Sequence, residues 1–243
     1  MNGLTSIIIP TYNCYAFLHE CIESIQSYTE APYEIIVVDN GSTDHTLKML
    51  KEKEITFISL PENKGFPAAC NYGIRFSRGD TVLLLNNDVL VRKRWLENML
   101  DCLFHAGDIG IVGPVSNYAS GKQQTEVPFT NVDDMALRFG SEHKGRYEQV
   151  HRIVGLCFLF RRELMDRVGL LDEQFSPGHF EDDDYCYRAR LAGYRLMIAH
   201  DAFVFHHGSA SFGRSGEEAV KQLIARNRQK FMEKWAVDPL ALI

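Results

Sequence analysis

Polar and acidic side chains cluster at points where apolar runs of the sequence end. Asp39 closes the run that starts at Glu34, and Asn87-Asp88 follows the run 82–85. A carboxylate flanked by amides offers the oxygen ligands that Mg²⁺ and Mn²⁺ prefer, and waters or phosphates complete the shell. The Asp39 carboxylate can accept a hydrogen bond from the ring N–H of a pyrimidine. Taken alone, a structural Asx turn or a helix cap explains each cluster as well.

The densest acidic cluster is the run from Glu181 through Asp182 and Asp183 to Asp184. Neighbouring carboxylates repel one another, so the run needs a helix N-terminus, a cation or a positively charged partner to stabilise it. Asp184 and Arg188 are four residues apart and can pair on a helix, which leaves Glu181 or Asp182 to face a cleft. Asp182 is therefore a candidate general base, and a solvated acidic cap is the alternative.

Two further clusters follow apolar runs. His206 and His207 end a run near the C-terminus, and Tyr12 follows the first run after Pro10 and Thr11. A histidine at a strand end can complete a metal shell through a ring nitrogen or contact a phosphate oxygen. A tyrosine ring can meet a base or a ribose. A structural histidine and a structural turn remain the alternatives.

The elements that must position these residues follow from hydrophobic periodicity. Apolar runs alternate with helical patterns in the first half, which is typical of βαβ units and a mainly parallel sheet. Such sheets bind ligands beyond the carboxyl ends of their strands, where the clusters lie. The expected strands are 6–9, 34–39, 55–60, 81–85 and 109–112, and the expected helices are 16–28, 46–53, 68–76 and 93–105.

The pattern changes after residue 115. Residues 116–150 are expected to form a loop-rich insertion with a short helix at 132–139, as in a lid or a binding loop. No repeat or linker interrupts the chain, so one domain with two lobes is expected. The remaining expected strands are 153–160, 194–199 and 202–206, and the remaining helices are 162–168, 181–192 and 217–235.

Composition limits the class of protein. The chain has 243 residues, 45% of them apolar, with 26 Lys plus Arg against 32 Asp plus Glu and a net charge of −6. This is typical of a folded soluble domain, and the acidic balance argues against nucleic acid as a partner. The run 4–9 is too short for a membrane span or a signal sequence, so we expect no transmembrane segment and a cytoplasmic protein. The six cysteines form no C-x-x-C pair and are expected to be reduced and mostly buried.

Seven ordered motifs between residues 6 and 213 resemble family 2 glycosyltransferases with the GT-A fold, especially the bacterial rhamnosyltransferase-like branch. The resemblance implies a Rossmann-like, mainly parallel sheet flanked by helices, with a smaller acceptor-side lobe. It also implies a single domain over 1–243, in which about 1–115 bind the nucleotide sugar and about 116–243 bind the acceptor and catalyse. The motifs are SIIIPTYN from Ser6, IIVVDNGSTD from Ile35, NKGFPAACNYGI from Asn63, VLLLNNDV from Val82, GLCFLFRRELMDRVGLLDE from Gly155, FEDDDYCYRARLAGY from Phe180 and FHHGSASFG from Phe205.

This resemblance implies transfer of a sugar, with inversion, from dTDP-rhamnose or a UDP-hexose to an acceptor hydroxyl. Polysaccharide biosynthesis, a lipid-linked glycan and a glycoprotein all fit as destinations, and residues 116–150 are expected to contact the acceptor. Asp182 matches the catalytic base, and Asp88 and His206 match positions near a Mg²⁺ or Mn²⁺ ion. Asn86 or Asn87 stands where many members have a further Asp, which weakens the metal site. The residues expected to bind the nucleotide sugar are Pro10, Tyr12, Asp39, Asn63, Gly65, Asn71, Asn87 and Glu181.

Two alternative functions fit the same residues less well. A sugar-nucleotide pyrophosphorylase needs a Gly-rich turn with an Arg after the first strand, and the residues after Pro10 do not supply it. A non-catalytic nucleotide-sugar-binding or partner-binding module of a glycosylation complex would have lost Asp88 or Asp182, and both are present. A lipid-linked acceptor fits a peripheral position at the inner face of the membrane. The terminal helix either covers the core or joins a homodimer.

Overall fold

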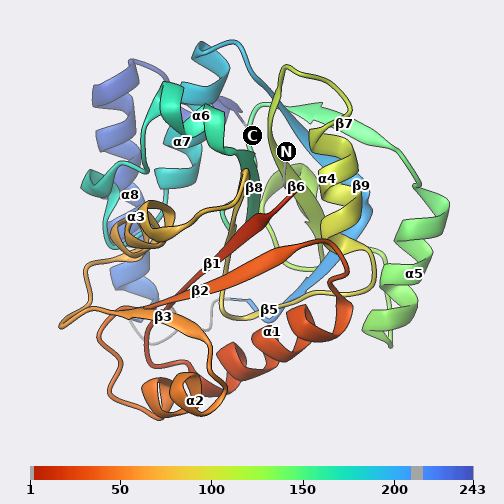
Figure 1. The fold of residues 1–243 in the computed structure, drawn as a ribbon. Coiled ribbons are helices and arrows are strands. Elements are labelled where there is room, and N and C mark those ends of the chain that lie inside the picture. The colour runs from red at the N-terminus through yellow and green to blue at the C-terminus, as the bar shows by residue number, and fades with distance from the viewer. Residues whose placement is uncertain (1–2, 209–215, 243) are drawn as a thin grey trace.

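The computed structural model describes residues 3–208 and 216–242. Its centre is a nine-stranded sheet (Figure 1). Eight strands follow the order β3-β2-β1-β4-β8-β6-β9-β5, and the ninth, β7, pairs with a different stretch of β9 than β5 does. Helices cover both faces of this sheet, so the α/β class is confirmed. The strands are β1 Thr5–Thr11, β2 Tyr33–Asp39, β3 Thr56–Ser59, β4 Thr81–Leu85, β5 Val89–Leu90, β6 Ile109–Ser116, β7 Tyr147–Val150, β8 Cys157–Arg161 and β9 Arg195–His206. The α-helices are α1 Tyr15–Tyr28, α2 Thr46–Glu52, α3 Phe66–Phe76, α4 Trp95–Leu103, α5 Val132–Glu142, α6 Arg162–Val168, α7 Glu181–Leu191 and α8 Glu217–Trp235.

The first half of the chain forms the parallel part of the sheet. β1 pairs in parallel with β2 and with β4, and β2 pairs in parallel with β3. Ile7 and Ile9 point into the core layer beneath α1 and α4, while Ile8 points into the layer beneath α3. This alternation is the two-residue period of a strand. It explains why β1, covered on both faces, is buried along its whole length.

The second half makes the sheet mixed rather than mainly parallel. β8 lies between β4 and β6 and is antiparallel to both, while β6 and β9 are parallel. β5 and β7 are antiparallel to β9. The chain enters β8 at the end where β4 finishes, because Cys157 lies opposite Leu85. A strand that starts there can only run back against β4.

Residues 116–150 are more ordered than the sequence indicated. After a short 3₁₀ turn at Gly121–Gln123, they contain α5 and the strand β7, in which Tyr147 pairs with Ala199. The two strands expected at 194–199 and 202–206 are the single strand β9, with a register shift opposite the Pro114/Val115 step of β6. The strand expected from residue 153 begins only at Cys157.

The cysteines and the terminal helix follow the sequence-based expectations. All six cysteines are buried free thiols. α8 turns Asn227 and Phe231, both with no exposed surface, toward the chain's own core, and the ring of Trp235 lies 5.0 Å from that of Tyr187 in α7. The buried face of α8 therefore covers the core.

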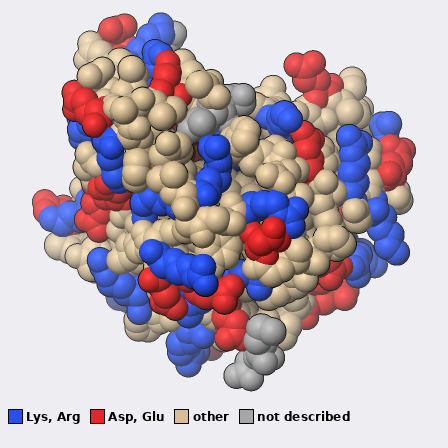
Figure 2. All heavy atoms as spheres, turned by 90° about the horizontal axis from the view of Figure 1, so that it is seen from above, with Lys and Arg blue, Asp and Glu red and all other residues tan. Residues whose placement is uncertain are grey.

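The surface carries both signs of charge. On the face shown in Figure 2, Lys and Arg side chains alternate with Asp and Glu, and no broad area of one sign stands out there. Among the described helices, even the 19-residue α8 lacks the apolar stretch that a membrane crossing requires.

Candidate active site

The ends of β1, β2 and β4 are joined into one edge by polar contacts. Thr11 lies opposite Asp39 in the ladder, and its carbonyl accepts a hydrogen bond from the Asn40 amide at 2.8 Å. The Thr11 hydroxyl accepts a hydrogen bond from Asn87 Nδ2, also at 2.8 Å. Asn87 is 4% exposed, so this contact fixes the residue beside Asp88 against β1. The strand-end clusters of the sequence therefore meet at one edge of the sheet.

Asp88 and His206 form a buried pair at that edge. Oδ1 of Asp88 lies 3.1 Å from Nε2 of His206, and Nδ1 of His206 lies 2.8 Å from the Tyr118 carbonyl oxygen. Burial lowers the pKa of His206, but the hydrogen bond and the charge of Asp88 outweigh burial, so the net pKa is raised above its ordinary value. The Tyr118 carbonyl takes an N–H from Nδ1 and so directs Nε2 at Asp88. Residues 209–213 of the FHHGSASFG motif lie outside the described residues.

This pair fits a divalent cation whose shell is shared with a substrate. A ring nitrogen and a carboxylate oxygen 3.1 Å apart can contact one ion. The Tyr118 carbonyl, on the opposite ring nitrogen, holds the imidazole in the orientation that directs Nε2 toward such an ion. Within residues 3–208 and 216–242, no group of three or more His, Cys, Asp or Glu side chains is placed to hold a metal. A Mg²⁺ or Mn²⁺ ion would therefore depend on waters and phosphates for its remaining ligands.

Asp182 lies in the first turn of α7 and is held by two backbone amides. Its Oδ2 accepts a hydrogen bond from Gly155 N at 2.8 Å, and its Oδ1 accepts one from Asp183 N at 2.9 Å. The residue after Gly155 connects this carboxylate to the metal edge, because the Leu156 carbonyl accepts a hydrogen bond from Asn86 N at 2.9 Å. Asp182 remains 8% exposed. A short chain of contacts thus joins the candidate base to the end of β4.

The other carboxylates of the cluster have separate roles. Asp183 Oδ1 lies 2.7 Å from Arg152 Nε, which provides the positive partner that the run of carboxylates requires. Burial and the nearby Asp182 raise the pKa of Asp183, although Arg152 opposes the shift. Burial, followed by Asp182, raises the pKa of Glu181 well above its usual range. Glu181 Oε2 is buried and has no hydrogen-bond partner within the described parts of the chain.

Asp184 is a structural member of the cluster. The pair predicted from its four-residue spacing is present, with Arg188 Nε 2.8 Å from Asp184 Oδ2. Its other oxygen accepts hydrogen bonds from Lys234 Nζ at 2.6 Å and from Trp235 Nε1 at 2.8 Å. Asp184 therefore connects α7 to α8 by hydrogen bonds.

The loop before α7 depends on a residue that the sequence analysis did not select. His179 and Phe180 both have positive φ, 70° and 72°, which is unfavourable for side chains of this size. Asn227 in α8 donates through Nδ2 to the carbonyls of Phe175, Gly178 and His179, at 2.6, 2.8 and 3.1 Å. Asn227 has no exposed surface. Its one sequence signal is that it falls four residues before Phe231 on the apolar stripe of α8, where a polar residue is unexpected.

Four of the residues expected to bind the donor lie at two places, the turn before α3 and the end of β1. Asn63 Oδ1 accepts hydrogen bonds from Asn40 Nδ2 and from Gly65 N, both at 2.9 Å, so the turn before α3 is bound to the end of β2. Gly65 has φ of 89°, and a Cβ there would lie 2.8 Å from Ser176 Oγ. Pro10 lies buried in β1, and Tyr12 follows it with 43% exposure.

Asp39 and Asn71 are engaged within the protein. Asp39 is fully buried, and its carboxylate accepts hydrogen bonds from Ser42 N at 3.2 Å and Ser59 Oγ at 3.3 Å. Asn71 Nδ2 donates to Leu171 O and to Glu173 Oε1, and its Oδ1 accepts from Leu171 N. Both amide N–H groups of Asn71 are thus used to attach α3 to the loop that leads toward α7.

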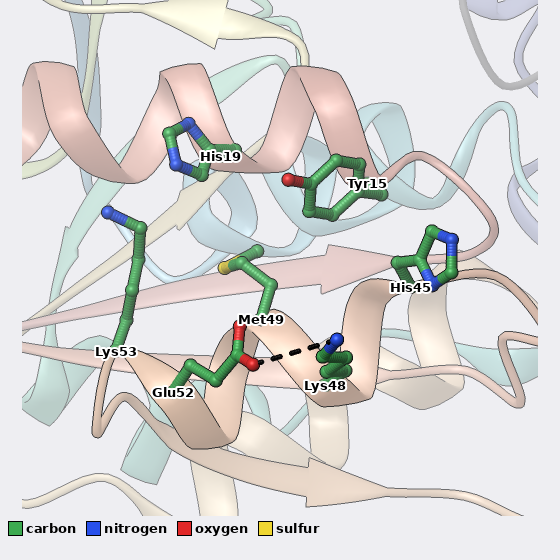
Figure 3. Close-up of a pocket in the computed structure, with 7 residues that line it drawn as sticks. All are labelled: Tyr15, His19, His45, Lys48, Met49, Glu52 and Lys53. Carbon is green, nitrogen blue, oxygen red and sulfur yellow. Dashed lines mark ion pairs between the residues drawn. The ribbon is translucent and has the colours of Figure 1, made fainter.

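A hollow of about 280 Å³ lies apart from this edge, between α1 and α2 (Figure 3). Tyr15 and His19 line it from α1, and Lys48 and Glu52 line it from α2. Lys48 and Glu52 form an ion pair at 3.8 Å, and none of the predicted site residues lines the hollow. It is therefore not part of the candidate active site.

The sequence is similar to a known protein family and to individual proteins. Residues 6–169 match the family described as Glycosyl transferase family 2. Glycosyltransferase AglE of Haloferax volcanii is 27% identical over 98% of this chain and 76% of its own length. The uncharacterized protein y4gI of Sinorhizobium fredii is 28% identical over 98% of this chain, which spans only 28% of that protein.

A solved structure shares the fold. The mannosyltransferase PcManGT of Pyrobaculum calidifontis, in complex with GDP-Man and Mn²⁺, aligns with a TM-score of 0.71 at 20% identity, over 94% of this chain and 64% of that one. This likeness, together with the mixed sheet and its flanking helices, identifies the GT-A fold. Because the family match covers most of the sequence, the chain belongs to glycosyltransferase family 2.

Proposed function

We propose that the chain transfers a sugar, with inversion, from a nucleotide-diphosphate donor to an acceptor hydroxyl, with Asp182 as the general base. The proposal rests on two hydrogen bonds that connect Asp182 to the end of β4. Gly155 N donates to Asp182, and the carbonyl of the next residue, Leu156, accepts from Asn86 N, two residues before Asp88. These contacts fix a carboxylate at a constant position relative to the edge where a diphosphate is expected to bind. A general base in such a position typically contributes about 10²–10⁴-fold in rate.

In this account the protein's own groups orient the reactants. Asp182 takes the proton of the acceptor hydroxyl, and the amides of Gly155 and Asp183 hold its two oxygens in place. Asp88 and His206 would hold Mg²⁺ or Mn²⁺, which would supply positive charge to stabilise the departing diphosphate. Supporting this cofactor, PcManGT was solved with GDP-Man and Mn²⁺.

For the donor side we keep the roles that the resemblance implies, with one change. We propose that Pro10, Tyr12 and Asp39 surround the nucleoside, and that Asn63 and Gly65 lie along the diphosphate and sugar. We also assign Asn87 and Glu181 to binding of the nucleotide sugar. Asn71 acts indirectly, because its amide N–H groups are occupied by Leu171 and Glu173.

The finer identity of the substrates is part of the same proposal. We take dTDP-rhamnose or a UDP-hexose as the donor, in keeping with the rhamnosyltransferase-like motifs, and a surface polysaccharide, a lipid-linked glycan or a glycoprotein as the acceptor. We place the reaction in the cytoplasm, with peripheral contact at the inner face of the membrane where the acceptor is lipid-linked. The presence of both Asp88 and Asp182 counts against a purely non-catalytic role.

The test is a thermal-shift and hydrolysis screen against UDP-, GDP- and dTDP-sugars, each with Mn²⁺, Mg²⁺ or EDTA. A ligand that binds only the folded state raises its stability in proportion to occupancy. The proposal predicts a metal-dependent shift with one nucleotide and slow release of its diphosphate. No shift and no hydrolysis with any donor would contradict it.

A further inference from the structure

A hollow of about 220 Å³ opens between residues 120–123 on one side and residues 149–152 and 154 on the other. Its volume suits about one sugar ring rather than an extended glycan. Lys122, His151 and Arg152 line it together with Ser120 and Gln149, and none of its lining residues is Asp or Glu. We call this hollow the 120/152 pocket. It falls at the border of the segment where the sequence analysis expected the acceptor.

The wall of the 120/152 pocket continues into the segment that holds the candidate base. Arg152 and Val154 line the pocket, and the next residue, Gly155, donates to Asp182 Oδ2. Arg152 also lies 2.7 Å from Asp183. The pocket wall is therefore continuous in sequence with the segment that holds Asp182.

Buried contacts join the two walls of the pocket, whereas the side chain of Lys122 is 62% exposed. Gln123 is 2% exposed, accepts a hydrogen bond from Val154 N at 2.7 Å and donates to the Pro114 carbonyl at 2.9 Å. Arg152 Nη1 donates to Ser120 Oγ at 2.9 Å. These contacts join the two walls across the hollow, so its shape is set before any ligand binds.

Two cationic side chains, Lys122 and Arg152, line the pocket. The side chain of Arg152 is only 17% exposed, with Nε beside Asp183 and Nη1 donating to Ser120, and the charges of Asp182 and Glu181 also act on it. Lys122 Nζ pairs with Glu148 at 2.7 Å, but Glu148 has a second partner in His200 Nε2 at 2.9 Å. Lys122 can therefore turn to a ligand while Glu148 keeps a hydrogen bond. A guanidinium and an ammonium are the groups that best recognise a carboxylate or a phosphate.

We propose that the 120/152 pocket binds the acceptor, and that the acceptor sugar bears an anionic group, a carboxylate or a phosphate, that contacts Lys122 and Arg152. This inference rests on the proposed function, since it names the acceptor class for that site. It goes beyond the motifs, because neither Lys122 nor Arg152 belongs to any of them.

The binding test uses small probes and does not require the donor. Amide chemical shifts of the protein are followed by NMR during titration with methyl glucuronide, glycerol phosphate and neutral methyl glucoside at constant ionic strength. The proposal predicts shifts at residues 120–124 and 149–155 with at least one anion, at an affinity several times higher than that of the glucoside. Which anion binds more tightly separates a uronic acid from a sugar phosphate. Equal affinity for all three probes, or shifts elsewhere only, would overturn the proposal.

A pair of lysine variants makes the test specific. Lys122→Gln removes the ammonium that faces the pocket, and Lys48→Gln removes one that pairs with Glu52 in the hollow between α1 and α2. A single partly exposed charge is worth about threefold in affinity. We expect Lys122→Gln to weaken binding of the preferred anion by about that factor and Lys48→Gln to leave it unchanged. Equal effects of the two variants would show a non-specific charge effect and overturn the proposal.

Donor hydrolysis by the wild-type protein, measured in the same preparations, separates the two hypotheses. Hydrolysis of a nucleotide sugar without preference for anionic acceptors overturns the acceptor class alone. Absence of donor binding and hydrolysis overturns the proposed function, and the titration then still decides whether the pocket selects anions.

Discussion

Nε2 of His206 lies 3.1 Å from Oδ1 of Asp88, although 118 residues separate the two in sequence. β5 makes this approach possible, because it follows Asp88 directly and pairs Val89 with His206. The backbone supports the same geometry, since His207 N donates to the Asp88 carbonyl at 3.0 Å. Two potential metal ligands from distant parts of the chain are thus fixed at one position.

His206→Gln and Asp88→Ala are each expected to weaken Mn²⁺ binding by more than about tenfold, because each would remove one of the two proposed protein ligands. Isothermal titration with Mn²⁺ in the presence of a nucleoside diphosphate measures the affinity. The exposed His105→Gln is the matched control and should bind as the wild type does. Unchanged affinity in both test variants would remove this pair from the metal site.

Asn227→Ala should lower the unfolding free energy by roughly 2–3 kcal/mol, because three carbonyls lose their shared donor in a buried place. The loop they belong to leads into α7, so kcat for transfer should also fall about tenfold at temperatures where the variant is fully folded. Urea unfolding and steady-state kinetics measure the two effects.

Gln229→Ala serves as the control for Asn227, since it removes an exposed amide from the same helix. It should change neither stability nor kcat by a measurable amount. A loss of stability in Asn227→Ala without any loss of kcat would show that α8 does not position the catalytic loop.

Glu181→Gln should stabilise the protein, and increasingly so as the pH rises. The folded-state pKa of Glu181 is raised well above its unfolded value, mainly by burial. Below the unfolded pKa, near 4.5, such a carboxyl group is protonated in both states and does not lower the stability of the fold. As the pH rises toward the folded pKa, the unfolded state ionises more readily than the folded state, and the free energy of unfolding falls. The neutral amide escapes that loss, so the variant should be more stable than the wild type at neutral pH.

Urea unfolding at pH 4.5 and pH 7.5 measures this difference. The exposed Glu218→Gln is the control and should show little change between the two pH values. A Glu181→Gln variant whose advantage is the same at both pH values would contradict the raised pKa.

The first half of the fold was predictable because its signals are local. The isoleucines of β1 are buried on both faces, and the helices between the strands show their apolar periods directly in the sequence. β7 gave no such signal. Its residues Tyr147 to Val150 are mostly polar or partly exposed, and the strand is specified by pairing with β9. The order of antiparallel strands likewise depends on tertiary contacts that no local period encodes.

The same distinction separates the parts of the site. The pair of Asp184 and Arg188 was predictable because four residues on a helix bring two side chains together. The contact of Asp182 with Gly155 was not, since it spans 27 residues, and neither was the contact of Asn227 with the carbonyls before α7. The motifs predicted which residues carry the chemistry, while the contacts that hold these residues in place span long stretches of sequence and follow from the tertiary structure.

The most direct test of the account is the pair of variants Asp182→Asn and Asp101→Asn, assayed for donor binding by calorimetry and for sugar transfer by product analysis. Asp101 is an exposed carboxylate in α4 and provides the control. If Asp182 is the general base, its variant binds donor as the wild type does, while transfer falls by about 10²–10⁴-fold and Asp101→Asn remains fully active. Full transfer activity in Asp182→Asn would contradict the mechanism.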